Sequence, residues 1–249
     1  MRDYMPHPAR LWSLIEAAAA AMLMFLPVTQ NETAAILVEP VQGEGGIKLP
    51  PDGFLQGLRQ LADANEILLM FDEVQCGSGR TGEWFAYQHF GVTPDVMTLA
   101  KALCGGIAGA AMLTTSEIAP SLRPGMHAAT FGGNPIAARA GIATLETIAR
   151  ENLLARAKSL GELFHSRFVE LQKNCDAVRE VRVLGLMIGV ELGFEGGAVL
   201  ERCLERNLLV NCTQGNVIRL LPAMTLSDEQ ANQGCDILSE VIQEVSAKQ

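Results

Sequence analysis

Short apolar runs, bounded by glycine, proline and acidic residues, recur through the first half of the chain. The runs at residues 34–38, 67–71, 95–99 and 110–114 have the length and composition of buried strands. Between the first two runs, leucines recur at the spacing of a helix face, with Asp52 as the expected N-terminal cap. Strands that alternate with helices favour an α/β fold, in which helices cover the faces of a parallel sheet.

The pattern changes after a long helical stretch in the middle of the chain. This stretch begins with the N-cap Asn134 and the first-turn Pro135 and continues, with breaks, to about Gln172. Beyond it we predict strands at residues 178–184, 187–192 and 217–221, and helices at residues 197–206 and 227–245, the last capped by Ser227. We therefore expect a lead segment (residues 1–31), a large domain (32–150) and a small C-terminal α+β domain (151–249).

The lead segment contains a mostly apolar stretch at residues 11–26. It follows Arg2 and Arg10, as the apolar part of a targeting peptide would, but no small-residue cleavage site follows it. The stretch is short for a membrane span and contains Glu16. We interpret it as an ordinary helix and expect a cytoplasmic protein without a membrane partner.

Composition excludes several classes of function. The chain has 249 residues and a formal net charge of −9. It has no runs of Lys or Arg, which argues against nucleic acid as a partner because phosphate binding needs a basic surface. The 6 cysteines form no CxxC pair and the 4 histidines are scattered, so we expect reduced thiols and no metal site.

Two motifs resemble nucleotide-binding signatures without meeting their requirements. Residues 77–82 match GxGxxG, but residues 72–76 separate them from the preceding strand and Glu83 and Trp84 begin a helix poorly. We interpret the segment as a glycine-rich functional loop rather than a nicotinamide or flavin site. The apolar run that ends at Asp72 and Glu73 resembles an ATPase strand, but the chain has no Gly-Lys dipeptide for the partner loop.

Charged residues follow three of the predicted strands. Glu39, Asp72 and Lys101 each come directly after, or within two residues of, an apolar run. Ligands of parallel sheets bind beyond the carboxyl ends of the strands, so these side chains should meet in one crevice. An acid or a lysine alone is typical of a solvated surface. Together they suit imine chemistry, in which the lysine forms a Schiff base and the acid keeps a pyridine nitrogen protonated.

Five segments in a fixed order now identify a family. They are EPVQGEGG at residues 39–46, FDEVQCG at 71–77, GRTG at 79–82, AKAL at 100–103 and TFGGNP at 130–135. They closely resemble the class III pyridoxal 5'-phosphate-dependent aminotransferases, above all those that act on N-acetylornithine, from about Glu32 to the C-terminus. The resemblance implies the aspartate-aminotransferase-like fold (fold type I), with a parallel-rich sheet in the large domain.

The activity that this family implies is amino transfer from N-acetylornithine, or a related ω-amino acid, to the 2-oxo acid 2-oxoglutarate, in arginine biosynthesis. Enzymes that use ornithine, succinylornithine or 4-aminobutyrate share most of the five segments and stay open as alternatives. A non-catalytic fragment of such an enzyme is the alternative from another functional class.

The resemblance also implies roles for individual residues. Lys101 would form the Schiff base with the cofactor and move the proton, Asp72 would pair with the pyridinium nitrogen, and Gln75 would bind the phenolic oxygen. Thr130 would reach the cofactor phosphate of a neighbouring subunit, which implies a homodimer with shared active sites.

Two further residues would bind the substrate. Arg219 matches the family arginine that grips the α-carboxylate, and Glu44 matches the glutamate that pairs with it. The residues themselves support this, because an arginine inside an apolar strand needs a partner and a carboxylate binds it through two parallel hydrogen bonds. A structural ion pair is the alternative for Arg219, and an ordinary loop carboxylate is the alternative for Glu44.

The chain also departs from the family pattern. Family members are longer at the N-terminal side, where they carry the phosphate-binding loop, the aromatic residue that stacks on the ring and contacts to the distal end of the substrate. Nothing in residues 1–31 resembles these features. Cys104 and Ala108 differ from the family residues in the loop after Lys101, which puts the conformation of that loop in question.

A sheet without its full set of strands exposes unpaired edges and an apolar face. We therefore predict that the 249-residue chain by itself is poorly soluble or lacks fixed tertiary packing. Thermal unfolding followed by circular dichroism tests this expectation. A soluble protein with one sharp, cooperative transition would contradict it.

Overall fold

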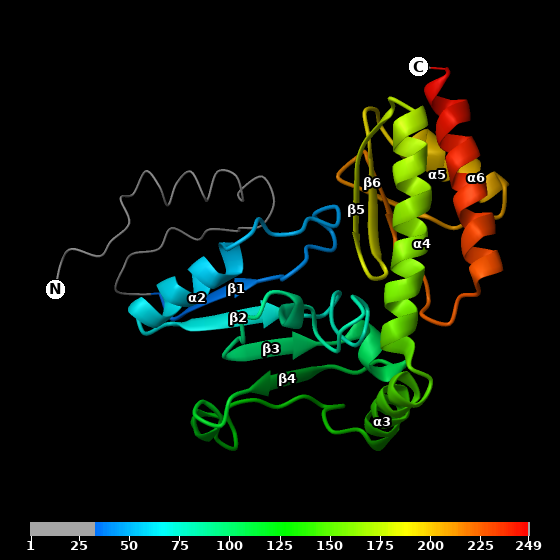
Figure 1. The fold of residues 1–249 in the computed structure, drawn as a ribbon. Helices are drawn as coiled ribbons and strands as arrows, with labels where there is room; N and C mark the ends of the chain where they lie inside the picture. Colours follow the sequence, from blue (N-terminus) through cyan, green and yellow to red (C-terminus); the bar gives the residue numbers. More distant parts are fainter. Residues whose placement is uncertain (1–32, 249) are drawn as a thin grey trace, which may run out of the picture.

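The computed structural model describes residues 33–248, which form two four-stranded sheets connected by two helices (Figure 1). The strand order is β1-β2-β3-β4 in the first sheet and β5-β6-β8-β7 in the second. The helix expected at residues 11–26 lies outside the described residues. Within residues 33–248, none of the helices combines the length and the apolar character needed to cross a bilayer.

The first sheet is built from β1 (Ala35–Val38), β2 (Leu68–Asp72), β3 (Val96–Leu99) and β4 (Ala111–Thr114). The first three strands run parallel, as predicted, whereas β4 is antiparallel to β3. The connection between β3 and β4 explains why the sheet is parallel-rich, as expected, rather than fully parallel. It contains only the short 3-10 helix η2 (Lys101–Cys104), and a parallel return needs a longer crossover that carries a full helix.

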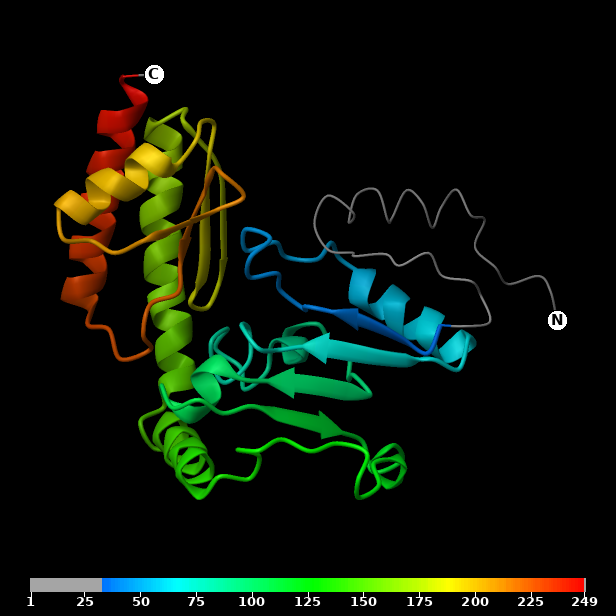
Figure 2. The ribbon, with the colours of Figure 1, turned by 180° about the vertical axis from the view of Figure 1, so that it is seen from behind.

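Helix α2 (Phe54–Ala64) covers one face of the first sheet (Figure 2). Leu55 packs there with Leu69 and Phe71 of β2. The helix is capped by Gly53 rather than by the predicted Asp52, and no side chain caps it. Gly53 has φ 79°, a left-handed conformation that glycine adopts without strain, and the N–H of Phe54 is already bonded to the carbonyl of Pro51.

The opposite face of the first sheet is open. It carries Asp72 and Thr98, which are partners in the β2–β3 register, and Met112 lies opposite Thr98 on β4. Leu37 of β1 is 58% exposed on this face. Among the described residues, β1 and β4 each have one edge without a neighbouring strand. The first sheet therefore has the exposed apolar face and the unpaired edges that the sequence led us to expect.

Helices α3 (Pro135–Arg150) and α4 (Leu153–Asn174) connect the two sheets. Asn134 caps α3 as predicted, because its side chain accepts hydrogen bonds from the N–H groups of Ile136 and Ala137. The predicted long helix breaks at Asn152, which has φ 53°. Beyond this break, α4 runs along the second sheet (Figure 1).

The second sheet is built from β5 (Val178–Leu184), β6 (Met187–Leu192), β7 (Asn211–Thr213) and β8 (Val217–Leu220), all antiparallel to their neighbours. Helices α4, α5 (Gly197–Glu205) and α6 (Asp228–Ser246) pack on one face and enclose the largest core of the described chain. Ser227 caps α6 as predicted. Strand β7 was not predicted, because its three residues, Asn-Cys-Thr, lack an apolar run.

The other face of the second sheet meets the first half of the chain. Arg182, Gly189, Arg219 and Asn211 lie side by side across its four strands. The segment after β1 reaches this face (Figure 1), where its Ile47 is fully buried with Met187 in a small core between the two sheets. This contact, rather than a flexible linker, sets the position of the second sheet relative to the first.

The glycine-rich loop at residues 77–82 also joins the two halves. The N–H of Leu186 donates to the carbonyl of Arg80, and a Cβ at Gly82 would lie 2.4 Å from the Lys158 side chain on α4. A side chain at Gly185 would meet the Thr81 backbone at the same distance of 2.4 Å. The glycines of this loop therefore permit close packing of the second sheet and α4 against the end of β2.

Candidate active site

Three charged side chains lie at one edge of the first sheet. Glu39 follows β1, Asp72 ends β2, and Lys101 comes two residues after the end of β3. Because these strands are parallel, their carboxyl ends lie at the same edge. The charges of Asp72 and Lys101 both act on Glu39, so the structure brings the predicted acid and the predicted amine together around a third group.

Glu39 is a half-buried carboxylate at the centre of this edge. Its Oε2 accepts a hydrogen bond of 2.9 Å from the N–H of Gly43. Burial raises the pKa of Glu39; the charge of Asp72 raises it further, while Gly43 and Lys101 act in the opposite direction. The sequence located Glu39 at a strand end without giving it a role.

Asp72 is held in one orientation. Its Oδ1 accepts hydrogen bonds from the N–H of Val74 at 2.9 Å and from the hydroxyl of Thr98 at 3.2 Å. The register pairs Asp72 with Thr98, so both side chains lie on the open face of the sheet. Within residues 33–248, Oδ2 has no hydrogen bond and is available to accept one from a ligand.

Lys101 has an unusual backbone conformation. Its φ is 46°, in the left-handed region that residues other than glycine rarely adopt. The side chain is exposed at the start of η2. Strained backbone of this kind is found preferentially at functional sites, where the surrounding structure fixes a side chain in one direction.

A second group of side chains surrounds Arg219 on β8. Its Nη1 donates to Glu44 Oε1 at 2.8 Å and to Gln75 Oε1 at 3.2 Å. Gln75 Nε2 in turn donates to Glu44 Oε1 at 3.3 Å, so the three side chains form a closed triangle. The structure therefore joins three residues that the sequence singled out, from three separate segments of the chain.

The members of this triangle differ in burial. The side chain of Arg219 is only 8% exposed, whereas that of Glu44 is 65% exposed. The hydrogen bond from Arg219 lowers the pKa of Glu44, and the charge of Lys101 contributes in the same direction. Arg219 Nε is buried without a hydrogen-bond partner in the described part of the chain. Both hydrogen bonds of this guanidinium within residues 33–248 come from Nη1, so Nη2 on the same edge can donate to a second carboxylate oxygen.

Gly43 makes room for the triangle. A Cβ at this position would lie 2.4 Å from the carboxamide of Gln75, closer than any real contact of such atoms. Any other residue would displace Gln75 from Glu44 and Arg219. The several glycines in residues 42–46 indicated a tight backbone turn here, but they could not indicate that Gln75 lies against Gly43.

Thr130 lies apart from both groups. It is exposed in the segment between the 3-10 helix η3 (Ala119–Ser121) and α3, and no hydrogen bond within residues 33–248 joins it to Lys101, Asp72 or Arg219. The apolar side chain beside it, Phe131, is 82% exposed. Of the predicted site residues, Thr130 is the one that the single chain leaves outside the site.

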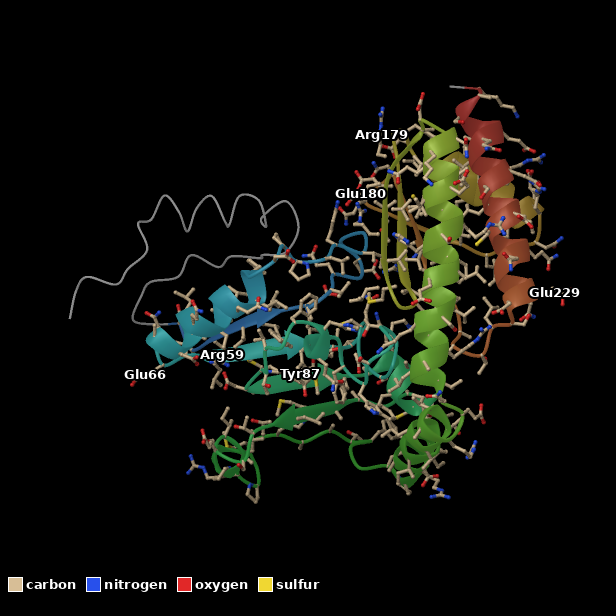
Figure 3. All side chains as sticks on the ribbon, viewed as in Figure 1. Arg59, Glu66, Tyr87, Arg179, Glu180 and Glu229 are labelled. Carbon is tan, nitrogen blue, oxygen red and sulfur yellow. The ribbon has the colours of Figure 1, made fainter. Side chains whose placement is uncertain are left out.

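Glu73 is a structural residue that the sequence did not identify. It is 1% exposed and accepts hydrogen bonds of 2.8 Å from the N–H groups of Ala86 and Tyr87, at the start of the 3-10 helix η1 (Ala86–His89; Tyr87 is labelled in Figure 3). Cys76 Sγ donates to the same carboxylate. Burial raises the pKa of both Glu73 and Cys76. Glu73 thereby ties the segment that carries Asp72 and Gln75 to η1.

Comparison with known proteins places these residues in a family context. The family model "Aminotransferase class-III" matches residues 9–242. The acetylornithine aminotransferase of Methanothermobacter thermautotrophicus is 46% identical over 86% of this chain and 55% of its own length. The chain spans about half the length of the curated relatives that it matches.

Solved structures of aminotransferases are also similar to this chain. The acetylornithine aminotransferase of Elizabethkingia anophelis has a TM-score of 0.79 at 37% identity, over 84% of this chain and 56% of that protein. An ornithine aminotransferase of Toxoplasma gondii, with partial occupancy of PLP at its active site, has a TM-score of 0.81 at 30% identity. That match covers 86% of this chain and 52% of the Toxoplasma protein.

Replacement of Glu73 tests its structural role. Glu73→Gln presents an amide group to backbone N–H donors, so we expect it to lower the free energy of unfolding by about 1–3 kcal/mol. Urea unfolding followed by circular dichroism measures this change. The control Glu83→Gln removes an exposed carboxylate paired with Lys158 and should cost less than about 1 kcal/mol. Equal effects of the two substitutions would contradict the role of Glu73.

Proposed function

The chain belongs to the class-III aminotransferases, and from this premise we propose that it forms the catalytic part of a pyridoxal-phosphate-dependent transaminase. The proposed reaction moves an amino group from N-acetylornithine to 2-oxoglutarate, in cytoplasmic arginine biosynthesis. The observation that carries the proposal is the adjacency of the two side-chain groups: Gln75, on the segment that directly follows Asp72, is hydrogen-bonded to both Arg219 and Glu44. An amine and a carboxylate-binding arginine thus face the same region.

Pyridoxal phosphate, when bound, supplies an aldehyde that condenses with a primary amine and a ring that accepts an electron pair. The residues present fit the ring end of this cofactor. Lys101 offers an exposed amine, and Asp72 offers an oriented carboxylate with a free Oδ2 that would hold the protonated ring nitrogen. Gln75 would donate its amide N–H to the phenolic oxygen. The Toxoplasma relative that holds PLP supports this assignment.

Lys101 would also act as the acid and base of the reaction. With the cofactor bound, its amine would remove and hold the proton of the substrate carbon that bears the amino group. The carboxylates of Glu39 and Glu44 lie close enough for the charge of Lys101 to act on both.

Arg219 would orient the substrate through its α-carboxylate. Nη1, which Glu44 now occupies, and the neighbouring Nη2 lie on one edge of the guanidinium and would supply two parallel donors to the two carboxylate oxygens, which fixes the direction as well as the position of the substrate. Glu44 would occupy Arg219 when no carboxylate is bound. Its exposed side chain can turn towards solvent when a substrate replaces it.

Another ω-aminotransferase is the second candidate, because ornithine aminotransferases are also among the similar structures. Amino-donor profiling separates these enzymes. N-acetylornithine should be the preferred donor, whereas a preference for ornithine or succinylornithine would reassign the substrate. A preference for 4-aminobutyrate, which has no α-carboxylate, would remove the proposed role of Arg219.

We further propose that the protein works as a homodimer with shared active sites. The support is the surface around Thr130, where large apolar side chains are exposed. They belong to the segment before α3 and to the first turn of α3: Leu122, Met126, Phe131 and Ile136. An apolar surface of this kind is typical of a protein–protein interface. A second copy on this surface would bring Thr130 to the cofactor phosphate of its neighbour.

Reductive trapping tests the cofactor site. We expect incubation with pyridoxal phosphate, borohydride reduction and peptide mapping to give one adduct, on Lys101. Lys101→Ala should abolish the adduct, and Lys158→Ala, which alters an exposed lysine paired with Glu83, should retain it. No adduct, or adducts on many lysines, would instead support a non-catalytic fragment, the alternative suggested by the partial coverage of the relatives.

Sedimentation velocity tests the dimer. Because a buried aromatic anchor contributes about 2 kcal/mol, we expect Phe131→Asp to raise the dimer dissociation constant about 30-fold. Leu209→Asp is the matched control, since Leu209 is equally exposed but lies between α5 and β7 of the second sheet. A monomeric wild-type protein, or equal effects of the two substitutions, would contradict the proposed interface.

A further inference from the structure

Glu44 lies on a closed loop of residues 42–48, which we call the Glu44 loop. The N–H of Gln42 donates to the carbonyl of Lys48 at 3.1 Å and closes the loop. By sequence the loop belongs to the first sheet, since it follows β1. By contact it belongs to the second sheet, because Ile47 packs on Met187 and a Cβ at Gly189 would lie 3.1 Å from the Gly46 carbonyl.

Arg182 on β5 holds the backbone of this loop. Its Nε and Nη2 donate to the carbonyl of Gly46 at 3.1 and 2.9 Å. Its Nη1 donates to Glu191 at 2.7 Å and contacts Glu180. Arg182 is only 5% exposed, and a buried guanidinium is tolerated only when its donors and its charge are satisfied. The Gly46 carbonyl is therefore part of a structural ion-pair site.

The same site has a second connection to the loop. Lys48 Nζ donates to Glu191 Oε2 at 3.2 Å, and Arg182 Nη1 binds that same oxygen. Glu191 thus links the end of the loop to the arginine that holds its centre. Loss of Arg182 would leave the Gly46 carbonyl without these donors and Glu191 without its closest cation.

Gln214 holds the loop from the other side. It lies in the turn between β7 and β8, and its Nε2 donates to the carbonyl of Glu44 at 2.8 Å. A Cβ at Gly46 would lie 3.2 Å from the Val217 side chain, so the loop backbone lies directly on β8. Arg182 and Gln214 therefore fix two carbonyl groups of the loop, and neither contact involves the Glu44 carboxylate.

The Glu44 carboxylate is attached differently. Within residues 33–248 it is held by Arg219 and Gln75 alone, and the side chain is largely exposed. Departure of this carboxylate breaks no backbone contact of the loop. It also leaves Arg219 paired with Gln75 Oε1 at 3.2 Å, so the buried guanidinium keeps one partner while it accepts another carboxylate.

We propose that Arg182 and Gln214 are positioning residues that keep the Glu44 loop docked on the second sheet while the Glu44 side chain leaves Arg219. The exchange of one carboxylate for another at Arg219 is then a side-chain rotation rather than a loop opening. The proposal rests on the proposed function in one respect, namely that a substrate carboxylate replaces Glu44. The hydrogen bonds from Arg182 to the Gly46 carbonyl and from Gln214 to the Glu44 carbonyl, which we call the two clamps, are a property of the free protein.

Hydrogen exchange of the full chain, without cofactor, tests the clamps. The reporter is the peptide of residues 40–50, with β6 as the internal reference for intact packing. We expect Gln214→Ala to accelerate exchange in the reporter about tenfold, with β6 unchanged, because one hydrogen bond to the loop is lost. Arg182→Gln should accelerate it at least as much, and Arg182→Lys, which keeps a donor for the Gly46 carbonyl, should recover part of the protection.

Two control variants separate the clamps from other effects. Glu44→Ala removes the ion pair with Arg219 but keeps both clamps, so the exchange rate of the reporter should stay within about twofold of wild type. Arg179→Gln alters an exposed arginine on the same strand as Arg182 (Figure 3) and should have no effect on the reporter. Because Gln214 is exposed, its substitution keeps the test informative if the Arg182 variants fail to fold.

Several outcomes would overturn the proposal. If Glu44→Ala accelerates exchange in the reporter as much as Gln214→Ala does, the ion pair between Glu44 and Arg219 holds the loop. An unprotected wild-type loop, or clamp variants without effect, would show that the clamps do not act. Addition of 2-oxoglutarate gives a last arm: binding should leave the reporter protected, and faster exchange would indicate that the whole loop opens. A protein that binds no 2-oxoglutarate would instead contradict the proposed function. The clamps would then be tested by the exchange rates of the variants alone.

Discussion

The buried guanidinium groups of Arg182 and Arg219 determine how the two halves of the chain meet. Both lie on the same face of the second sheet, on either side of Gly189, which leaves space for the Glu44 loop between them. A buried charge must find partners, and each arginine finds them on this loop. Arg182 takes a backbone carbonyl and Arg219 takes a side-chain carboxylate. Arg182 therefore fixes the backbone of the loop, whereas Arg219 holds a carboxylate that another carboxylate can replace.

Much of the architecture follows from the sequence because its signals are local. Apolar runs located every strand except β7 to within about a residue at each end, and the side chains of Asn134 and Ser227 cap their helices as predicted. The antiparallel direction of β4 was not predicted, because it depends on the length of a connection rather than on the strand itself. The cap of α2 was wrong because a turn from Pro51 already satisfied the first N–H of the helix.

The candidate site was predictable only in part, for a similar reason. Strand ends indicated Glu39, Asp72 and Lys101, and an arginine in an apolar strand indicated that Arg219 needs a partner. The same reasoning applies to Arg182 in β5, but several charged neighbours along that strand obscured the signal. Glu73 and Gln214 gave no signal, because a sequence does not show which backbone N–H or carbonyl a polar side chain will meet. Thr130 stays a prediction, since the contacts of one chain do not include its proposed partner.

The attachment of the Glu44 loop to the second sheet has a geometric consequence. A rotation of the second sheet relative to the first would carry Arg219 and Glu44 together, because both move with that sheet. The distance between them would not change, whereas the distance from either one to Lys101 would. The distance between Arg219 and Lys101 is thus the dimension of the site that a rotation between the two sheets would change. Under the proposed function, the angle between the two sheets would therefore set the distance that a substrate has to span between its carboxylate and the amino group that it transfers.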